Sequence, residues 1–380
     1  MKITFSGDIC ASIPGQSMDI APDVELVYKN SDFNIACLEA PVLDKDRDEY
    51  KKIGPNLRQE KSSLETFIHL FSHVSLANNH SMDYGEGGLY DTLEYLSKKG
   101  IHGIGAGLSF PSMYEPAILE KEGIKVALFC WAEAQYGCCK SSEHNQGYAW
   151  MLHPQTYKLI QDYKKQCDYV ILFVHAGLED VDCPIIEWRE QYRAYVDYGV
   201  DLVIGNHPHA IQGKEIYKGK MIYYSLGNFY FIGKYANESS MWTNSLLLEC
   251  DVTTEGLSFC EHFIHFSDRR IQMSALEIEQ HFAELTELLK PEHYAEYKRI
   301  HDEMILNCWE EYYKSYFSFP IWKIKPRVVF YRRWFNRLMY DYAHHCFLPP
   351  VSENKLYHNV NIDTHRFVVS RACSIIAGTY

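Results

Sequence analysis

Carboxylate, amide and imidazole side chains stand at the ends of apolar runs in the first two-thirds of this 380-residue chain. They occur in Gly7-Asp8, Leu38-Glu39, Asn78-Asn79-His80, His175 and Gly205-Asn206-His207-Pro208-His209. Because loops that follow strands gather at one edge of an α/β sheet, we expect these side chains to meet there. Two carboxylates, one amide oxygen and three imidazoles can hold two divalent cations, which activate water for hydrolysis. Mixed nitrogen and oxygen ligands suit Mn, Fe or Zn better than Ca.

The elements that must position these side chains follow from the spacing of apolar residues. Apolar runs predict strands at 2–6, 32–38, 73–77, 124–131, 169–174, 202–205, 221–225, 245–252 and 257–265. Helical spacing occupies 64–71, 87–98, 155–166 and 184–198. Gly100 and Gly199 follow two of these helices, and Pro184 begins one, as helix stop and start signals do.

Strands separated by helices indicate an α/β domain, and the later run of adjacent strands indicates antiparallel pairing on one side. We predict a sandwich of two sheets flanked by helices over residues 1–267. From 273 to 317, 326 to 342 and 365 to 377 the spacing is helical instead. Residues 268–380 are therefore predicted to form an α-helical extension packed on the first domain.

The overall composition excludes some classes of protein. A formal net charge of −13 argues against nucleic-acid binding, which requires a basic surface. It does not exclude an anionic substrate, because bound cations can dominate the local field. The sequence shows neither a secretory leader nor an apolar stretch of transmembrane length. Together with 12 Cys and no Cys-x-x-Cys pair, this predicts a cytoplasmic protein with reduced thiols.

Five motifs in order give this sequence a resemblance to a known family. The order Gly-Asp, acidic residue, Asn-His, His and Gly-x-His-x-His resembles the calcineurin-like metallophosphoesterase superfamily. Within it, the particular forms are similar to the CapA, or poly-γ-glutamate capsule biosynthesis, family. These forms are Leu-Glu-Ala-Pro (38–41), the segment 75–85, Gly-Ala-Gly (105–107), Ile-Gly-Asn-His-Pro-His (204–209) and Tyr-Ser-Leu-Gly-Asn-Phe (224–229). The resemblance covers residues 1 to 235 and implies a metallophosphoesterase-like four-layer α/β/β/α sandwich.

The resemblance also implies roles for individual residues. The first cation would be bound by Asp8 and His209, the second by Asn79, His175 and His207, and Glu39 would bridge the two. His80 would act on the substrate as a proton donor or anion stabiliser, and Asp83 would orient His80.

The sequence departs from the superfamily at two ligand positions. The first motif is often Asp-x-His, which supplies a further ligand, but here it is Asp8-Ile9-Cys10. The usual bridging Asp is replaced by Glu39, as in CapA-type sequences. The first cation site is therefore predicted to be weak or filled only with substrate. Cys10 could offer a thiolate, although a buried structural role is favoured by two to one.

Four other features each have a functional explanation and a simpler structural one. Glu179 either faces the substrate or is an exposed loop acid, with equal weight. Asn206 and Asn228 could support the ligand loop, but turn-forming roles are slightly favoured. The Arg-rich aromatic stretch at 327–340 could bind an acidic polymer or a membrane surface. Packing of an amphipathic helix on its own domain explains that stretch more simply.

Two functions from different classes fit these patterns. The first is a metal-dependent hydrolase of the CapA type, using a metal-activated water on a phosphoester or a γ-glutamyl amide. Its substrate would be an anionic small molecule or polymer of capsule or polysaccharide biosynthesis. The second is a non-catalytic factor that binds the capsule polymer or the capsule-synthesis machinery. The family name concerns a process, so it fixes neither reaction.

Overall fold

A computed structural model describes residues 1–143, 145–233, 239–274, 276–314 and 358–379. The chain divides into two compact units, Met1–His301 and Asp302–Tyr380. The first unit contains every strand of the described chain. The domain boundary predicted at 267 stays a prediction. The Arg-rich aromatic stretch at 327–340 lies outside the described residues.

The first of two large sheets has nine strands with β1 near its centre. Eight of its strands follow one another across the sheet in the order β2 (Asp19–Ile20), β18 (Arg270–Met273), β17 (Leu257–Ser267), β16 (Asn244–Val252), β1 (Lys2–Ala11), β3 (Phe33–Leu38), β4 (His73–Ser75) and β5 (His102–Ile104). A ninth strand, β15 (Asn228–Ile232), also pairs with β1. From β1 to β5 the pairs are parallel, while β1, β16, β17 and β18 pair antiparallel.

The second large sheet has six strands. In order they are β13 (Ile211–Tyr217), β14 (Lys220–Leu226), β12 (Leu202–Asn206), β11 (Tyr169–His175), β8 (Ile124–Ala132) and β7 (Ala117–Lys121). The four inner strands β14, β12, β11 and β8 are parallel, and the two outer strands pair antiparallel with them. A small third sheet contains β6 (Ala106–Gly107), β10 (Gly147–Ala149) and β9 (Cys138–Cys139).

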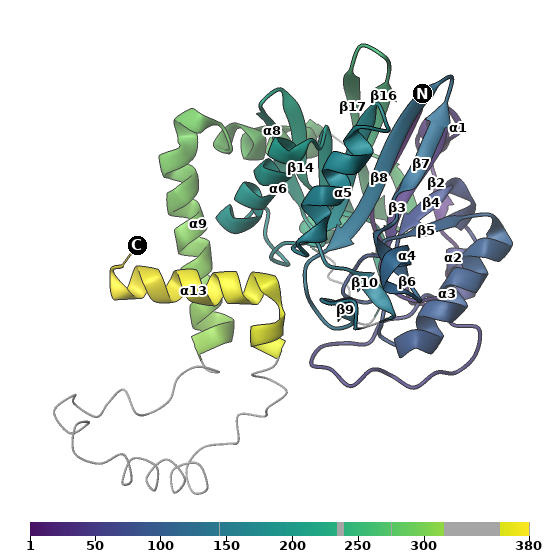
Figure 1. Ribbon diagram of the computed structural model, residues 1–380, viewed down its shortest axis with the longest axis horizontal. Coiled ribbons are helices and arrows are strands. Elements are labelled where there is room, and N and C mark those ends of the chain that lie inside the picture. The colour runs from purple at the N-terminus through teal and green to yellow at the C-terminus, as the bar shows by residue number, and fades with distance from the viewer. Residues whose placement is uncertain (144, 234–238, 275, 315–357, 380) are drawn as a thin grey trace, which may run out of the picture. The chain divides into compact units, whose positions relative to one another are not determined.

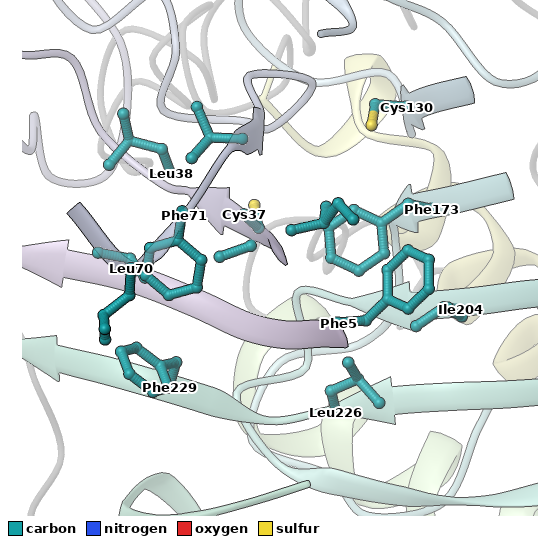
Figure 2. Close-up of a cluster of buried hydrophobic side chains, with 14 of the residues drawn as sticks. Phe5, Cys37, Leu38, Leu70, Phe71, Cys130, Phe173, Ile204, Leu226 and Phe229 are labelled. Carbon is teal, nitrogen blue, oxygen red and sulfur yellow. The ribbon is translucent and has the colours of Figure 1, made fainter. Parts of the chain in front are cut away.

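The two large sheets pack face to face through one apolar core. Figure 2 shows Phe5 of β1 beside Phe173 of β11, with ring centroids 5.8 Å apart. Side chains alternate between the faces of a strand, so Ile171, Phe173 and His175 share the face toward this core. The same rule places Ile35 and Cys37 of β3 on the opposing inner face. Both strands therefore lead from apolar side chains to polar ones at their carboxyl ends.

Helices cover the outer faces of both sheets (Figure 1). The nine-stranded sheet is covered by α1 (Pro22–Lys29), α2 (Lys61–Leu64), η1 (Ile68–Leu70) and α3 (Gly85–Lys99). The six-stranded sheet is covered by α5 (Gln155–Lys164) and α6 (Ile186–Tyr198). Two further short helices are α4 (Phe110–Tyr114) and α7 (Ser240–Thr243). The predicted sandwich of two sheets between helical layers is confirmed.

Helices also follow the last strand, as the sequence predicts. Within the first unit, α8 (Leu276–Leu288) packs against β13, with Phe282 on Phe263 of β17. The short η2 (Pro291–His293) then leads to α9 (Tyr294–Cys308). The π-helical turn η3 (Trp309–Tyr313) and α13 (Asp363–Ala377) contact each other within the second unit.

The first strand is longer than the sequence predicts. We expected it to end at residue 6 with Asp8 in the following loop, but β1 continues to Ala11. The cause is β15, which pairs with β1 from Asp8 to Ala11 although it lies more than 200 residues away in the sequence. Pairing is irregular on either side of Asp8, so this residue leaves the regular ladder while remaining inside the strand.

The core between the sheets gives a stability prediction. Replacing Phe173 by Ala should lower the free energy of unfolding by roughly 3–5 kcal/mol, because the ring is buried and leaves a cavity between the sheets. Urea unfolding followed by circular dichroism measures this change. Ile216→Ala is the control: its side chain is 72% exposed, and the expected change is within about 0.5 kcal/mol. Equal losses in both variants would contradict the assigned core.

Candidate metal centre

His175 lies at the centre of the predicted site because β11 ends on the inner face of its sheet. Its Nδ1 atom is 3.3 Å from Asp8 Oδ1 and 3.4 Å from Cys37 Sγ. Its Nε2 atom is 3.4 Å from Glu39 Oε1 and 3.0 Å from Asn79 Oδ1. One imidazole therefore contacts side chains from three segments of the opposite sheet.

Asp8 and Glu39 are completely buried carboxylates. Within the described chain, Asp8 Oδ1 and both carboxylate oxygens of Glu39 accept no hydrogen bond. The other oxygen of Asp8 accepts one from the backbone N–H of His207, at 3.0 Å. Buried charge without hydrogen bonds is costly unless cations offset it. This donor set and its unsatisfied oxygens fit divalent cations.

The loop after β12 carries His207 and His209 in left-handed backbone conformations, with φ of 97° and 57°. Such conformations are rare for residues other than glycine and concentrate at functional sites. The strand before this loop requires Gly205, whose added Cβ would lie 2.0 Å from the Tyr224 carbonyl oxygen of β14. The Nδ1 atom of His209 is 2.9 Å from Asn228 Oδ1. Strand β14 thus packs closely against the strand that leads into this loop, and Asn228 supports the ring of His209 by a hydrogen bond.

Four overlapping groups of side chains offer ligand atoms within 4.8 Å of one another. They are Asp8–Glu39–His209, Glu39–His175–His207, Asp8–Cys37–His175 and Glu179–His207–His209. The first two groups match the two predicted cation sites, and Glu39 belongs to both. Asn79 adjoins the second through His175. The structure thus brings all six predicted ligand residues together, while their roles as ligands stay predictions.

His80 and Asp83 form a second arrangement beside the predicted ligands. The Nδ1 atom of His80 is 2.6 Å from Asp83 Oδ2, which also accepts a hydrogen bond from the Leu57 N–H at 2.7 Å. The other oxygen of Asp83 pairs with the buried ammonium of Lys52, which lies 3.4 Å from His80 Nδ1. Asp83 therefore fixes the orientation of His80 and leaves its Nε2 atom without a hydrogen bond to any described residue.

Mutual electrostatics shifts the ionisation of the central groups. Burial alone would lower the pKa of His175, but Glu39 and Asp8 outweigh it and raise that pKa to about 10. Burial opposes the same influence at His209, whose pKa is also raised by Glu39 and Asp8. For Asp8, burial favours the neutral acid, yet His175 holds the pKa below its usual range. Asp8 and these two imidazoles thus favour each other's charged forms.

Several residues of the site are not signalled by the sequence. Cys37 and Glu133 lie in or directly after apolar strands and look like ordinary core positions. Glu133 Oε1 is nevertheless 3.4 Å from His207 Nε2, and Gln135 Nε2 is 3.2 Å from the same atom. Lys52 lies in a polar segment that resembles any solvated loop. No pattern in the sequence distinguishes these four residues from structural ones.

Cys10 lies apart from the cation ligands. Its Sγ atom is 2.9 Å from Ser12 Oγ, and it packs with Ala40 and Leu57. Burial raises the pKa of this thiol well above its usual range. The favoured buried role therefore agrees with the structure, and Cys10 does not supply the ligand that Asp-x-His would give.

Comparison with known proteins assigns the chain to a family. Residues 2–232 match the model of "Bacterial capsule synthesis protein PGA_cap", which is more than half of the chain. The protein therefore belongs to this bacterial capsule synthesis family, and the resemblance found in the sequence is confirmed.

Curated relatives match about half of the chain. The "Capsule biosynthesis protein CapA" of Bacillus anthracis is 31% identical over 210 residues, covering 53% of this chain and 51% of that protein. The "PGA biosynthesis protein CapA" of Bacillus subtilis (strain 168) is 30% identical over 211 residues, covering 55% of each. This chain thus spans about half the length of the curated relatives it matches.

Among solved structures, a 5'-nucleotidase precursor from Thermus thermophilus aligns with a TM-score of 0.41 and 10% identity, covering 70% of this chain and 55% of the other.

In the described ranges, no helix combines the length and apolar character that crossing a bilayer requires.

Lys52 provides a test of the His80 arrangement. Lys52→Met should lower the free energy of unfolding by roughly 3–5 kcal/mol, because it leaves the Asp83 charge buried without its partner. Chemical denaturation measures this loss. Lys98→Met is the control, since the Lys98–Glu94 pair is exposed and should contribute less than about 1 kcal/mol. A similar small loss in both variants would show that Asp83 does not need Lys52.

The raised pKa of His175 predicts proton release on cation binding. In the cation-free protein this imidazole keeps its proton until the pH approaches its pKa of about 10. An imidazole that binds a cation must be neutral. Raising the pH toward 10 therefore strengthens binding, and lowering it weakens binding. Calorimetric Mn²⁺ titrations at pH 8, in two buffers with different protonation enthalpies, should show release of about one proton per protein or more. Binding without proton release would contradict this charge state.

Proposed function

We propose that this protein is a metal-dependent hydrolase that cleaves a phosphoester or a γ-glutamyl amide in capsule or polysaccharide biosynthesis. The observation that carries the proposal is the set of three buried, unsatisfied carboxylate oxygens of Asp8 and Glu39, which face three imidazoles. If these residues only stabilised the fold, apolar side chains would serve as well, because burying charged groups together is costly. Family membership supports the link to capsule synthesis.

The residues would divide into two cation sites that share Glu39. Asp8 and His209 would hold the first cation, and Asn79, His175 and His207 the second. When bound, two divalent cations such as Mn, Fe or Zn supply Lewis-acid stabilisation and lower the pKa of the attacking water. Asp8 would also hold the His207 loop through the His207 N–H.

His80 would act beside the cations on the leaving group. Asp83 accepts from Nδ1 of His80, so the imidazolium form of His80 would donate its second proton, the one on Nε2, to the departing oxygen or nitrogen. Lys52 offsets the charge of Asp83, so that this carboxylate repels an anionic substrate less. The substrate would be an anionic small molecule or polymer, and the capsule-synthesis machinery is the proposed partner. A cytoplasmic location stays a prediction.

The test compares the wild-type protein with His207→Ala/His209→Ala after removal of metals and addition of Mn²⁺. We expect two bound Mn²⁺ per wild-type chain, and hydrolysis of a phosphodiester, a phosphomonoester or a γ-glutamyl anilide. The double variant should lose both, because each predicted cation site loses an imidazole. Metal analysis and release of nitrophenol or nitroaniline measure the two effects.

A second variant separates chemistry from metal binding. His80→Asn should still bind two Mn²⁺, yet its turnover should fall by roughly 10²–10⁴-fold through loss of the proton donor. Cations bound without turnover on all three substrate classes would favour the non-catalytic assembly factor. Absence of Mn²⁺ binding in the wild-type protein would reject the metal centre itself.

A further inference from the structure

The predicted first cation site has one ligand fewer than its superfamily pattern. Asp8, Glu39 and His209 offer three donors, and the residue that would add an imidazole in Asp-x-His is Cys10. Because the Cys10 thiol lies with Ala40 and Leu57, the missing donor must come from elsewhere or remain absent. This question concerns the cations of the proposed function and rests on it.

Glu179 offers a carboxylate on the open side of the two loop histidines. Its Oε1 atom is 3.8 Å from His207 Nε2, and ligand atoms of Glu179, His207 and His209 lie within 4.8 Å of one another. The Glu179 side chain is 51% exposed, whereas the other carboxylates near these imidazoles are buried. Glu179 therefore approaches from the solvent side while Asp8 and Glu39 approach from the protein interior.

The loop that carries Glu179 is held against the histidine loop. Gly177 packs on Pro208 so closely that an added Cβ would lie 2.7 Å from Pro208 Cγ. The N–H of Asp180 donates to the Pro208 carbonyl oxygen at 3.0 Å. These contacts lie on both sides of Glu179 in the sequence, and Pro208 stands between the two histidines. These contacts between the two loops thus fix the position of the Glu179 backbone relative to His207 and His209.

Trp242 of α7 also holds the loop of Glu179 in place. Trp242 donates its indole N–H to Asp180 Oδ1 at 2.5 Å, and its ring lies 4.3 Å from the His209 ring. Asp180 adopts a left-handed backbone with φ of 61°, like the two histidines. Strained residues on two loops that face each other indicate a geometry maintained for function rather than for stability. An ordinary exposed loop acid would need none of these restraints.

We propose that Glu179 supplies a further cation ligand beside His209, in place of the one that Asp8-Ile9-Cys10 lacks, from the solvent side of the two loop histidines. A carboxylate is a suitable replacement for an imidazole at Mn, Fe or Zn. It also adds a negative charge where two divalent cations would otherwise face only two carboxylates. The restrained loop and Trp242 hold this ligand in place.

The experiment titrates metal-free full-length protein with Mn²⁺ and follows free Mn²⁺ by electron paramagnetic resonance. In Glu179→Gln, one of the two cations should bind roughly 10- to 100-fold more weakly, while the other keeps its wild-type affinity. Asp182→Asn is the matched control: it removes one acid from the same loop, where Asp182 faces His281 at 3.3 Å. This control should bind both cations as the wild type does. Glu179→His should restore part of the lost affinity by returning an imidazole.

The outcomes separate this inference from the proposed function. Two unchanged affinities in Glu179→Gln would overturn the inference and leave the proposed metal centre standing. Equal weakening in Glu179→Gln and Asp182→Asn would also overturn it, because a general charge effect would then explain the loss. A wild-type protein that binds no Mn²⁺ would reject the proposed function, and the inference with it.

Discussion

The structure depends on bringing the carboxylates of Asp8 and Glu39 together in its interior, where both are completely buried. Their charges are offset by the imidazoles of His175 and His209, and the oxygens that accept no hydrogen bond remain available for cations. The surrounding architecture serves this arrangement. Parallel strands of both sheets end at the same edge, so that carboxylates from one sheet meet imidazoles from the other. The apolar core around Phe5 and Phe173 sets the distance between them.

Further polar side chains hold the residues at this centre in position. Asn228 holds His209, Asp83 holds His80, and Lys52 in turn pairs with Asp83. Such outer contacts fix ring orientation and tautomer before any ligand arrives. They also explain why the loops tolerate left-handed residues: hydrogen bonds and close packing from neighbouring strands offset the conformational cost.

Much of this could be predicted from the sequence, because apolar periodicity and residue type carry local information. His175 follows an apolar run, and His207-Pro208-His209 follows another, so their convergence at a sheet edge could be expected. The end of the first strand could not be predicted correctly, because the strand around Asp8 is completed by β15, a distant partner that local patterns do not reveal. Glu133 and Lys52 were missed for a related reason: only three-dimensional contacts distinguish them from core and surface residues.

The central position of β1 has a consequence for how the chain is made. The partner of one side of this strand, β3, is synthesised early, but the other side is covered by β15 and β16, which end at Ile232 and Val252. At about 5–20 residues per second, the ribosome needs roughly 10–50 s to deliver them. Throughout that interval the first strand has an open hydrogen-bonding edge. The nascent protein is therefore most exposed to misassociation before β15 and β16 appear.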